Sequence, residues 1–446
     1  MHILFLAYYF PPESSSGSFR PLFFANELSE KGHQVTVVTA KQGAYLPDQP
    51  LDPDLVKQVC PSIEIIRCAV FRPRELLIRI KTYLSRNLKP GAVASSTAVQ
   101  DSQSRTGKFQ RLKDFITDIL ATPDPHVGWL PFAVWGASKV VRKNRCDVIY
   151  ATGSPWSGLL SGVVLKLMSG KPLIVDFRDP WVSNPNFSVR TAPVKIIDRF
   201  FERRVVKHAD IVIANTQELQ EDFKKRYPEF CKNKVTVITN GFEDYAVTNK
   251  PGSVDTEVFT ITHAGALYFS RNPSFLLTAL RELIADGAIS AQKIQLKFVG
   301  GIDVADPNLS LLLRDPLLAD SIRIIPRVSF EEAKQYMTKS HVLLLIQPDF
   351  PLQIPRKLYD YMSVRKPVFA ICENDSATSN IIGRFSLGYQ CQNVIMDIKE
   401  TLLSMYQDWE NDRLRDFSDA RCDKFMNKHL AEELHSVMTE TLAVKS

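Results

Sequence analysis

Short apolar runs alternate with amphipathic segments along most of the chain. The runs at 2–8, 34–40 and 147–152 are apolar almost throughout, which is typical of parallel strands buried on both faces. Between the first two, residues 19–31 have the spacing of a helix, with Pro21 in its first turn and Gly32 after its end. This alternation of strand and helix predicts a doubly wound α/β fold.

A second series of the same kind begins near residue 259, after a Gly- and Pro-bearing stretch at 240–252. We therefore predict two doubly wound, Rossmann-like α/β domains that face each other across a cleft, a favoured place for a ligand. The predicted N-terminal domain covers residues 1–245 and the predicted C-terminal domain covers residues 253–425. A final helix at about 426–446 would pack back on the first domain.

Composition narrows the class of protein. The chain has 446 residues, 45% of them hydrophobic, and a formal net charge of +6. This modest charge favours attraction to anionic surfaces over dedicated nucleic-acid binding, and we find no nucleic-acid motif. The seven cysteines form no CxxC pair, which favours a reducing compartment and argues against structural zinc. With neither a signal peptide nor a spanning segment in the pattern, we expect a cytoplasmic protein or one on the cytoplasmic face of a membrane.

A basic segment at 70–89 interleaves six Arg or Lys residues with apolar ones. One interpretation is an amphipathic helix that lies on an anionic membrane. The other is a peripheral helix of the first domain whose basic face is solvated.

The start of a helix after Pro355 carries an unusual charge pattern. Arg356 and Lys357 occupy its first turn, where the helix dipole is already positive, so each cation costs roughly 0.3–1 kcal/mol. A bound phosphate would remove that penalty, because free backbone N–H groups at a helix start also suit an anion. The alternative is a pair of solvated surface cations.

Two loops of the first domain follow predicted strands and offer further candidates. Gly17 lies in a loop of small residues after the first strand, although the loop lacks a GxGxxG pattern. Asp176, Arg178 and Asp179 lie at the end of the strand at 172–177. The alternatives are a plain strand–helix connection for the first loop and an internal ion pair that shapes the turn for the second.

Five motifs in order resemble the GT-B glycosyltransferases, specifically the large retaining family 4. The resemblance covers the chain except about residues 41–120, and each motif is short. The motifs are Ala7-Tyr8-Tyr9-Phe10-Pro11-Pro12, Thr152-Gly153-Ser154-Pro155-Trp156, Asp176-Phe177-Arg178-Asp179-Pro180-Trp181, Asn240-Gly241-Phe242 and Pro355-Arg356-Lys357-Leu358-Tyr359-Asp360-Tyr361.

The resemblance implies a nucleotide-sugar donor held mainly by the C-terminal domain, and a glycan or lipid-linked acceptor held by the N-terminal one. It implies no metal and no further cofactor, since cations and helix starts replace the divalent ion at the diphosphate. By position, Gly17 matches the loop beneath the donor phosphate and Lys357 the residue that neutralises the diphosphate, with Arg356 beside it. Asp360 matches the second acid of the E-x7-E element, which holds the ribose.

The sequence also departs from the family pattern. The first acid of E-x7-E falls at Leu352, so the usual contact to the donor sugar lacks its carboxylate. In the Arg-x(4–5)-Lys pair, Arg271 matches the arginine, but Phe275 stands near the lysine position. The acceptor-loop histidine is replaced by the region of Arg178 and Asp179.

The expected reaction needs a stabilised leaving diphosphate and deprotonation of an acceptor hydroxyl. Lys357, Arg271 and the helix start would supply the first, and Asp179 or Asp176 the second. The leading hypothesis is a retaining glycosyltransferase of surface polysaccharide or glycolipid synthesis. A sugar-nucleotide epimerase on the GT-B scaffold and a non-catalytic nucleotide-sugar-binding protein are the alternatives.

Overall fold

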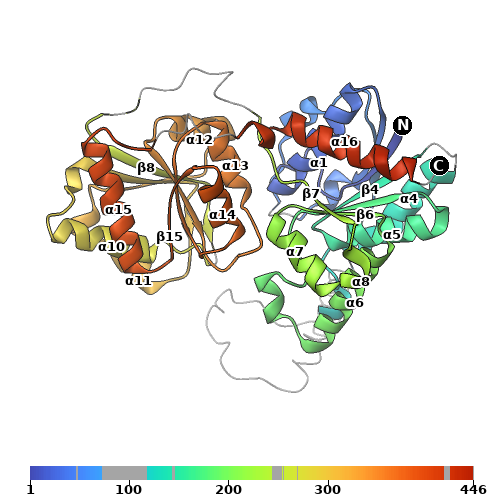
Figure 1. Cartoon of the computed structure of the whole chain (residues 1–446), viewed down its shortest axis with the longest axis horizontal. Helices are drawn as coiled ribbons and strands as arrows, with labels where there is room; N and C mark the ends of the chain where they lie inside the picture. The colour runs from blue at the N-terminus through green and yellow to red at the C-terminus, as the bar shows by residue number, and fades with distance from the viewer. Residues whose placement is uncertain are drawn as a thin grey trace, which may run out of the picture. The chain divides into compact units, whose positions relative to one another are not determined.

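The computed structural model describes the chain except residues 47–48, 73–117, 143–145, 244–253, 255, 269, 416–421 and 445–446. The described residues form two compact units, each with its own sheet (Figure 1). The N-terminal unit comprises residues 1–215, 222–237 and 431–446, and the C-terminal unit comprises residues 216–221 and 238–430. From residue 73 onward, the basic segment at 70–89 lies outside the described residues.

Seven parallel strands of the described chain form the sheet of the N-terminal unit, in the order β3-β2-β1-β4-β5-β6-β7. The strand order reverses between β1 and β4, as in a doubly wound fold. The strands are β1 (His2–Leu6), β2 (Gln34–Ala40), β3 (Glu64–Cys68), β4 (Val148–Gly153), β5 (Leu173–Phe177), β6 (Ile211–Ala214) and β7 (Val235–Val237). The helices are α1 (Ser16–Glu30), α4 (Leu130–Arg142), α5 (Trp156–Ser169), α6 (Ala192–His208), α7 (Gln217–Arg226), α8 (Pro228–Cys231) and α16 (Asn427–Ala443), with α7 and α16 each divided between the two units.

The C-terminal unit repeats this architecture with a parallel sheet in the order β12-β10-β8-β13-β14-β15. Here the order reverses between β8 and β13. The strands are β8 (Phe259–Ala264), β10 (Ile294–Val299), β12 (Ile322–Ile325), β13 (Val342–Gln347), β14 (Val368–Cys372) and β15 (Gly388–Cys391), and the two-residue strands β9 (Leu267–Tyr268) and β11 (Ile302–Asp303) pair separately. The helices are α10 (Ser274–Ala285), α11 (Pro307–Leu312), α12 (Phe330–Thr338), α13 (Arg356–Ser363), α14 (Ala377–Arg384) and α15 (Ile395–Glu410).

Helices cover both faces of this second sheet. Successive side chains of a strand point to opposite faces, so alternate residues pack against different helices. Leu344 and Ile346 of β13 belong to a core cluster with α10 and α15, whereas Leu343 and Leu345 belong to a cluster with α13 and α14. Figure 1 shows the two sets of helices on either side of the sheet. The predicted fold class of two doubly wound α/β domains is confirmed. No helix in the described part of the chain has both the length and the apolar character needed to cross a bilayer.

A buried ion pair joins α1 to the middle of the first sheet. Asp176 on β5 is fully buried, and Arg20 on α1 donates from Nε to Oδ2 (2.8 Å) and from Nη2 to Oδ1 (3.0 Å). The hydroxyls of Tyr150 and Thr152, both on β4, also donate to Oδ2. The carboxylate is therefore fully hydrogen-bonded inside the sheet, which offsets the cost of burying its charge.

We predict that Arg20→Ala lowers the free energy of unfolding of the N-terminal unit by about 3–5 kcal/mol, because it leaves Asp176 buried without a cation. The matched control is Lys57→Ala, which breaks the exposed pair between Lys57 and Asp54 and should cost no more than about 1 kcal/mol. Urea unfolding followed by circular dichroism measures both. Equal, small losses in the two variants would contradict the structural role of the buried pair.

Candidate functional site

The first candidate site lies where the strand order of the C-terminal sheet reverses. The carboxyl ends of parallel strands diverge at such a point and leave room for a ligand. Here the ends belong to β8, which leads to Gly265, and β13, which ends at Gln347 and precedes α13. The residues of the predicted donor site that lie in this unit come from these two connections.

Lys357 lies in the first turn of α13, as predicted. Pro355 is the N-cap residue, with φ −65° and ψ 140°, so the helix begins at Arg356. The Nζ atom of Lys357 lies 2.9 Å from Nε2 of His263, which is buried near the end of β8. The same Nζ donates to the carbonyl oxygen of Ala266 (3.2 Å). These two partners are uncharged groups, one on β8 and one in the connection that follows it.

Arg271 lies beyond β9 in the same connection. Its Nε donates to Oε1 of Gln347 at the end of β13 (3.1 Å), and its Nη1 donates to the hydroxyl of Tyr268 (2.9 Å). The pKa of Lys357 is lowered to about 7, mainly by burial and to a smaller extent by the nearby positive charge of Arg271. Within the described residues, neither Lys357 nor Arg271 contacts a carboxylate, so two cations lie together without an anionic partner.

Glycines allow the backbone to approach this pair closely. Gly265 has φ +100°, and a Cβ there would lie 2.7 Å from Cε of Lys357. Gly300, at the end of β10, has φ +114°, and its Cβ would lie 2.8 Å from the backbone carbon of Gly265. Side chains at either position would therefore displace the lysine or the β8 connection.

The other two predicted residues of α13 pair with each other. Nη2 of Arg356 lies 3.8 Å from Oδ1 of Asp360, which is one helical turn further along α13. Each of the two side chains is about one-fifth exposed. Burial raises the pKa of Asp360 and lowers the pKa of Arg356. Arg356 is therefore largely neutralised within its own helix, unlike Lys357.

In the N-terminal unit, Gly17 and Arg178 are brought together. The helix α1 begins at Ser16, three residues before the predicted start, so Gly17 lies in its first turn and not in the loop before it. Pro21 has no N–H, so the carbonyl of Gly17 lacks its usual helical donor, and Nη1 of Arg178 donates to it instead. Arg178 also donates to the carbonyls of Gly153 and Ser154, which ties the first turn of α1 to the ends of β4 and β5.

The two aspartates of this region differ. All the contacts of Asp176 are with Arg20, Tyr150 and Thr152 inside the unit, so its oxygens face no open surface. Asp179, two residues beyond β5, is partly exposed. The geometry favours the internal ion pair as the role of Asp176, with Arg20 as its partner, and leaves Asp179 as the accessible acid of the pair.

The pattern of the sequence does not single out His263. It lies in an apolar strand, where a histidine is most often a core residue, and its partner is 94 positions away in the chain. The available signal was its position two residues before Gly265, at the carboxyl end of a strand. Asp124 gives no local signal either, because its partner is 33 positions away: it caps α5 by accepting from the backbone N–H of Ser157 (2.8 Å).

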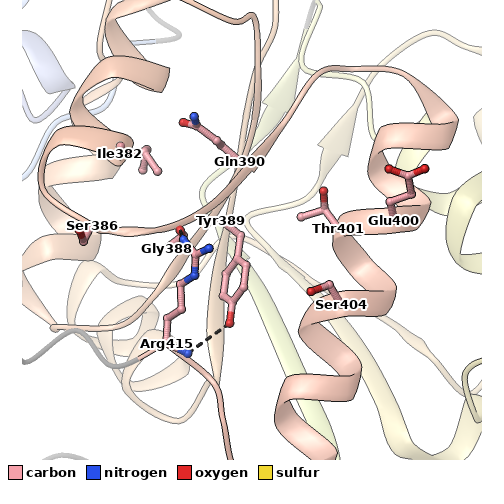
Figure 2. A pocket seen from close by; sticks show the side chains of 10 residues that line it. Ile382, Ser386, Gly388, Tyr389, Gln390, Glu400, Thr401, Ser404 and Arg415 are labelled. Atoms are coloured by element: carbon pink, nitrogen blue, oxygen red, sulfur yellow. Dashed lines mark hydrogen bonds between the residues drawn. The ribbon is translucent and has the colours of Figure 1, made fainter.

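The C-terminal unit also has a surface pocket of about 470 Å³, shown in Figure 2. It is lined by residues of α14, β15 and α15 and by Arg415, whose backbone N–H donates to the hydroxyl of Tyr389 (3.2 Å). Because β15 is the edge strand, three places from β8, this pocket is remote from the reversal point. None of the predicted site residues lines it.

Comparisons with known proteins agree with this architecture. Residues 102–244 match the model of Glycosyltransferase Family 4. A search of curated proteins finds no match to the chain.

The described residues contain no group of three or more His, Cys, Asp or Glu side chains placed to hold a metal ion.

Solved structures match over nearly the whole chain. Sucrose-phosphate synthase from Thermosynechococcus elongatus has a TM-score of 0.63 and 13% identity, with 99% of each chain covered. Anabaena HepE in complex with UDP has a TM-score of 0.62 and 14% identity, covering 99% of this chain and all of HepE. The lipopolysaccharide outer core galactosyltransferase WaaB has a TM-score of 0.57 and 11% identity, with 99% of each chain covered.

At these identities the structural likeness establishes the fold, and the family match adds the class of enzyme. The motifs at 152–156, 176–181 and 240–242, which suggested the resemblance, all lie within the matched residues. The chain is therefore a glycosyltransferase of the GT-B fold whose residues 102–244 are similar to Glycosyltransferase Family 4.

Proposed function

We propose that this glycosyltransferase moves a sugar from a nucleoside diphosphate donor to a hydroxyl of a glycan or lipid-linked acceptor, with retention, in surface polysaccharide or glycolipid synthesis. The observation that carries the donor assignment is the pair of cations, Lys357 and Arg271, whose partners among the described residues are all uncharged. A diphosphate supplies the missing negative charge. The HepE structures with UDP and with UDP-glucose support this class of ligand.

The donor side of the reaction follows from these contacts. As the bond to the sugar breaks, negative charge develops on the leaving diphosphate, and Lys357 and Arg271 stabilise it. The backbone N–H groups at the start of α13 add to the positive potential. Asp360 would hold the ribose hydroxyls, with its carboxylate oriented by Arg356. Because Leu352 replaces the first acid of the family element, another group must contact the donor sugar.

On the acceptor side, we assign Asp179 the role of general base, because it is the partly exposed acid beyond β5. Arg178 supports this loop and donates to the carbonyl oxygen of Gly17 in the first turn of α1. Asp176 acts beneath them by anchoring α1 through Arg20. Acceptor-dependent release of a nucleoside diphosphate separates this proposal from an epimerase and from a non-catalytic binding protein.

We predict that Lys357→Ala lowers kcat by roughly 100- to 1000-fold, because the contact matters most as charge develops on the leaving group. Asp360→Asn should mainly raise KM for the donor, since a ribose contact is the same before and after the transition state. The matched control is Lys339→Ala, an exposed lysine after α12. Steady-state kinetics and melting temperature are measured together. A folded and fully active Lys357→Ala protein would end the donor-site assignment.

We predict that turnover survives excess EDTA. The prediction rests on the two cations, which take the place of a divalent ion at the diphosphate, and on the absence of an Asp-x-Asp motif at the end of a strand. Release of nucleoside diphosphate is followed before and after chelation. If activity is lost and manganese restores it, the two cations alone do not stabilise the leaving diphosphate.

The proposal also places the enzyme at the anionic face of a membrane, and α6 offers a suitable surface. Its solvent-facing side carries Ile196 (65% exposed) and Phe200 (51% exposed). The same side is basic, while both acids of the helix are fully buried. The exposed basic residues are Arg199, Arg203, Arg204 and Lys207, of which Arg203 lies 3.3 Å from Glu229. An apolar strip flanked by cations is the pattern of a helix that lies on anionic lipid.

We predict that the full chain co-sediments with phosphatidylglycerol vesicles at low salt and poorly with phosphatidylcholine vesicles. Arg199→Glu with Arg204→Glu should weaken this binding by roughly 30-fold or more, at about 1 kcal/mol for each lost cation. The control, Arg314→Glu with Arg327→Glu, makes the same change in net charge at exposed positions of the C-terminal unit. Equal weakening by both pairs, or no vesicle binding by the wild type, would contradict a membrane surface on α6.

A further inference from the structure

His263 has one fixed tautomer. Its Nδ1 lies 2.9 Å from the carbonyl oxygen of Leu344 on β13. A carbonyl oxygen only accepts, so Nδ1 must carry the hydrogen. The neutral ring therefore presents the lone pair of Nε2 to Lys357, whose Nζ donates to it at 2.9 Å.

The surroundings of the ring keep it in place. His263 is 1% exposed, in the middle of the sheet between β10 and β13. The carbonyl of Leu344 also accepts from the hydroxyl of Tyr361 (2.9 Å), which in turn accepts from the backbone N–H of Ala264 (3.1 Å). Since Tyr361 and Lys357 both belong to α13, this network fixes the helix start relative to β8 and β13.

Among the residues that the structure describes, few charged groups face Lys357. Arg271 faces it from the connection after β9, and Asp360 lies on its own helix, where it pairs with Arg356. His263 faces it from β8, and burial together with the charge of Lys357 holds the pKa of this histidine well below its usual value. An ammonium group at this position is thus stabilised by two uncharged acceptors and destabilised by burial and by Arg271.

We propose that His263 is a positioning residue for the transfer reaction: its neutral imidazole holds Lys357 Nζ at the carboxyl end of β8, and binding of the donor diphosphate to that lysine takes up a proton. This inference rests on the proposed function, in that it requires the diphosphate to bind at Lys357. An ammonium group has three N–H donors, of which His263 and Ala266 use two. The third is left for a phosphate oxygen.

The direction of the pH dependence follows from the state of the lysine. In the free protein, burial lowers the pKa of Lys357 to about 7, so above this pH the side chain is mostly neutral. A bound diphosphate favours the ammonium form and raises the pKa. Donor affinity should therefore fall as the pH rises above 7, because the neutral lysine must then take up a proton from solution when the donor binds. Loss of the His263 acceptor would lower the pKa of Lys357 further and move this fall to lower pH.

The experiment measures binding of UDP by calorimetry at pH 8, in buffers that differ in ionisation enthalpy. GDP and ADP serve as probes if UDP does not bind. We expect the wild type to take up a proton on binding, because Lys357 is mostly neutral at pH 8 in the free protein. Lys357→Met should abolish this uptake. Failure of all three nucleotides to bind the wild type would overturn the proposed function and this inference together.

The variants at position 263 test the positioning role. His263→Leu removes the acceptor and should weaken binding roughly 10- to 100-fold, the range for a hydrogen bond to a charged group. His263→Gln supplies an amide oxygen as the acceptor and should restore most of the affinity. In the Lys357→Met background, His263→Leu should have little further effect, because both changes remove the same interaction. The control is His341→Leu, a partly buried histidine that bonds Trp409 and the backbone of Thr260.

Three results would overturn the inference. The first is a folded His263→Leu protein that binds UDP as tightly as the wild type. The second is an equal loss of affinity from His263→Leu with and without Lys357. The third is binding of UDP at pH 8 without proton uptake. If Lys357→Met binds UDP as tightly as the wild type, the proposed donor site itself is refuted. If Lys357→Met binds weakly but His263→Leu keeps the wild-type affinity, only the role of the histidine is refuted.

Discussion

The reversal of strand order in each sheet constrains where chemistry can occur in this protein. Parallel strands bring all their carboxyl ends to one edge, and a gap between the connections opens only where the order reverses. In the C-terminal unit that point lies between β8 and β13, and it gathers His263, Lys357 and Arg271 from segments nearly a hundred residues apart. In the N-terminal unit it lies between β1 and β4, next to the connections that hold Gly17 and Arg178.

The two reversal points differ in how their charges are balanced. In the N-terminal unit, Arg20 is neutralised by the buried Asp176, and Arg178 is held by backbone carbonyls, so these cations brace the connections. In the C-terminal unit, Lys357 and Arg271 have uncharged partners only, among the described residues. A cation held by neutral groups costs stability unless an anion arrives, and this is the physical basis for assigning the donor to this unit.

The sequence predicted most of the fold because buried parallel strands and amphipathic helices have distinct periods. It also predicted the position of Lys357 in the first turn of a helix, where two cations are unfavourable without an anion, and the role of this lysine at a diphosphate stays a prediction. It could not predict the role of His263, because periodicity does not show which distant side chain a strand residue contacts. Nor could it decide between a catalytic and a structural role for Asp176, which depends on Arg20, 156 positions away. The sequence predicts the start of α1 three residues too late, because Pro21 is typical of a first turn. The helix accommodates Pro21 farther from its start because Arg178 donates to the carbonyl of Gly17.

The donor assignment places a nucleotide sugar at the reversal point of the C-terminal sheet. Hydrogen–deuterium exchange of the full chain, with and without a panel of nucleotide sugars, tests it most directly. We expect at least one of them to slow amide exchange at Gly265 and Ala266 and at the start of α13, around Arg356 and Lys357. Protection confined to another part of the chain, such as the pocket beside β15, or no protection by any nucleotide sugar, would contradict it.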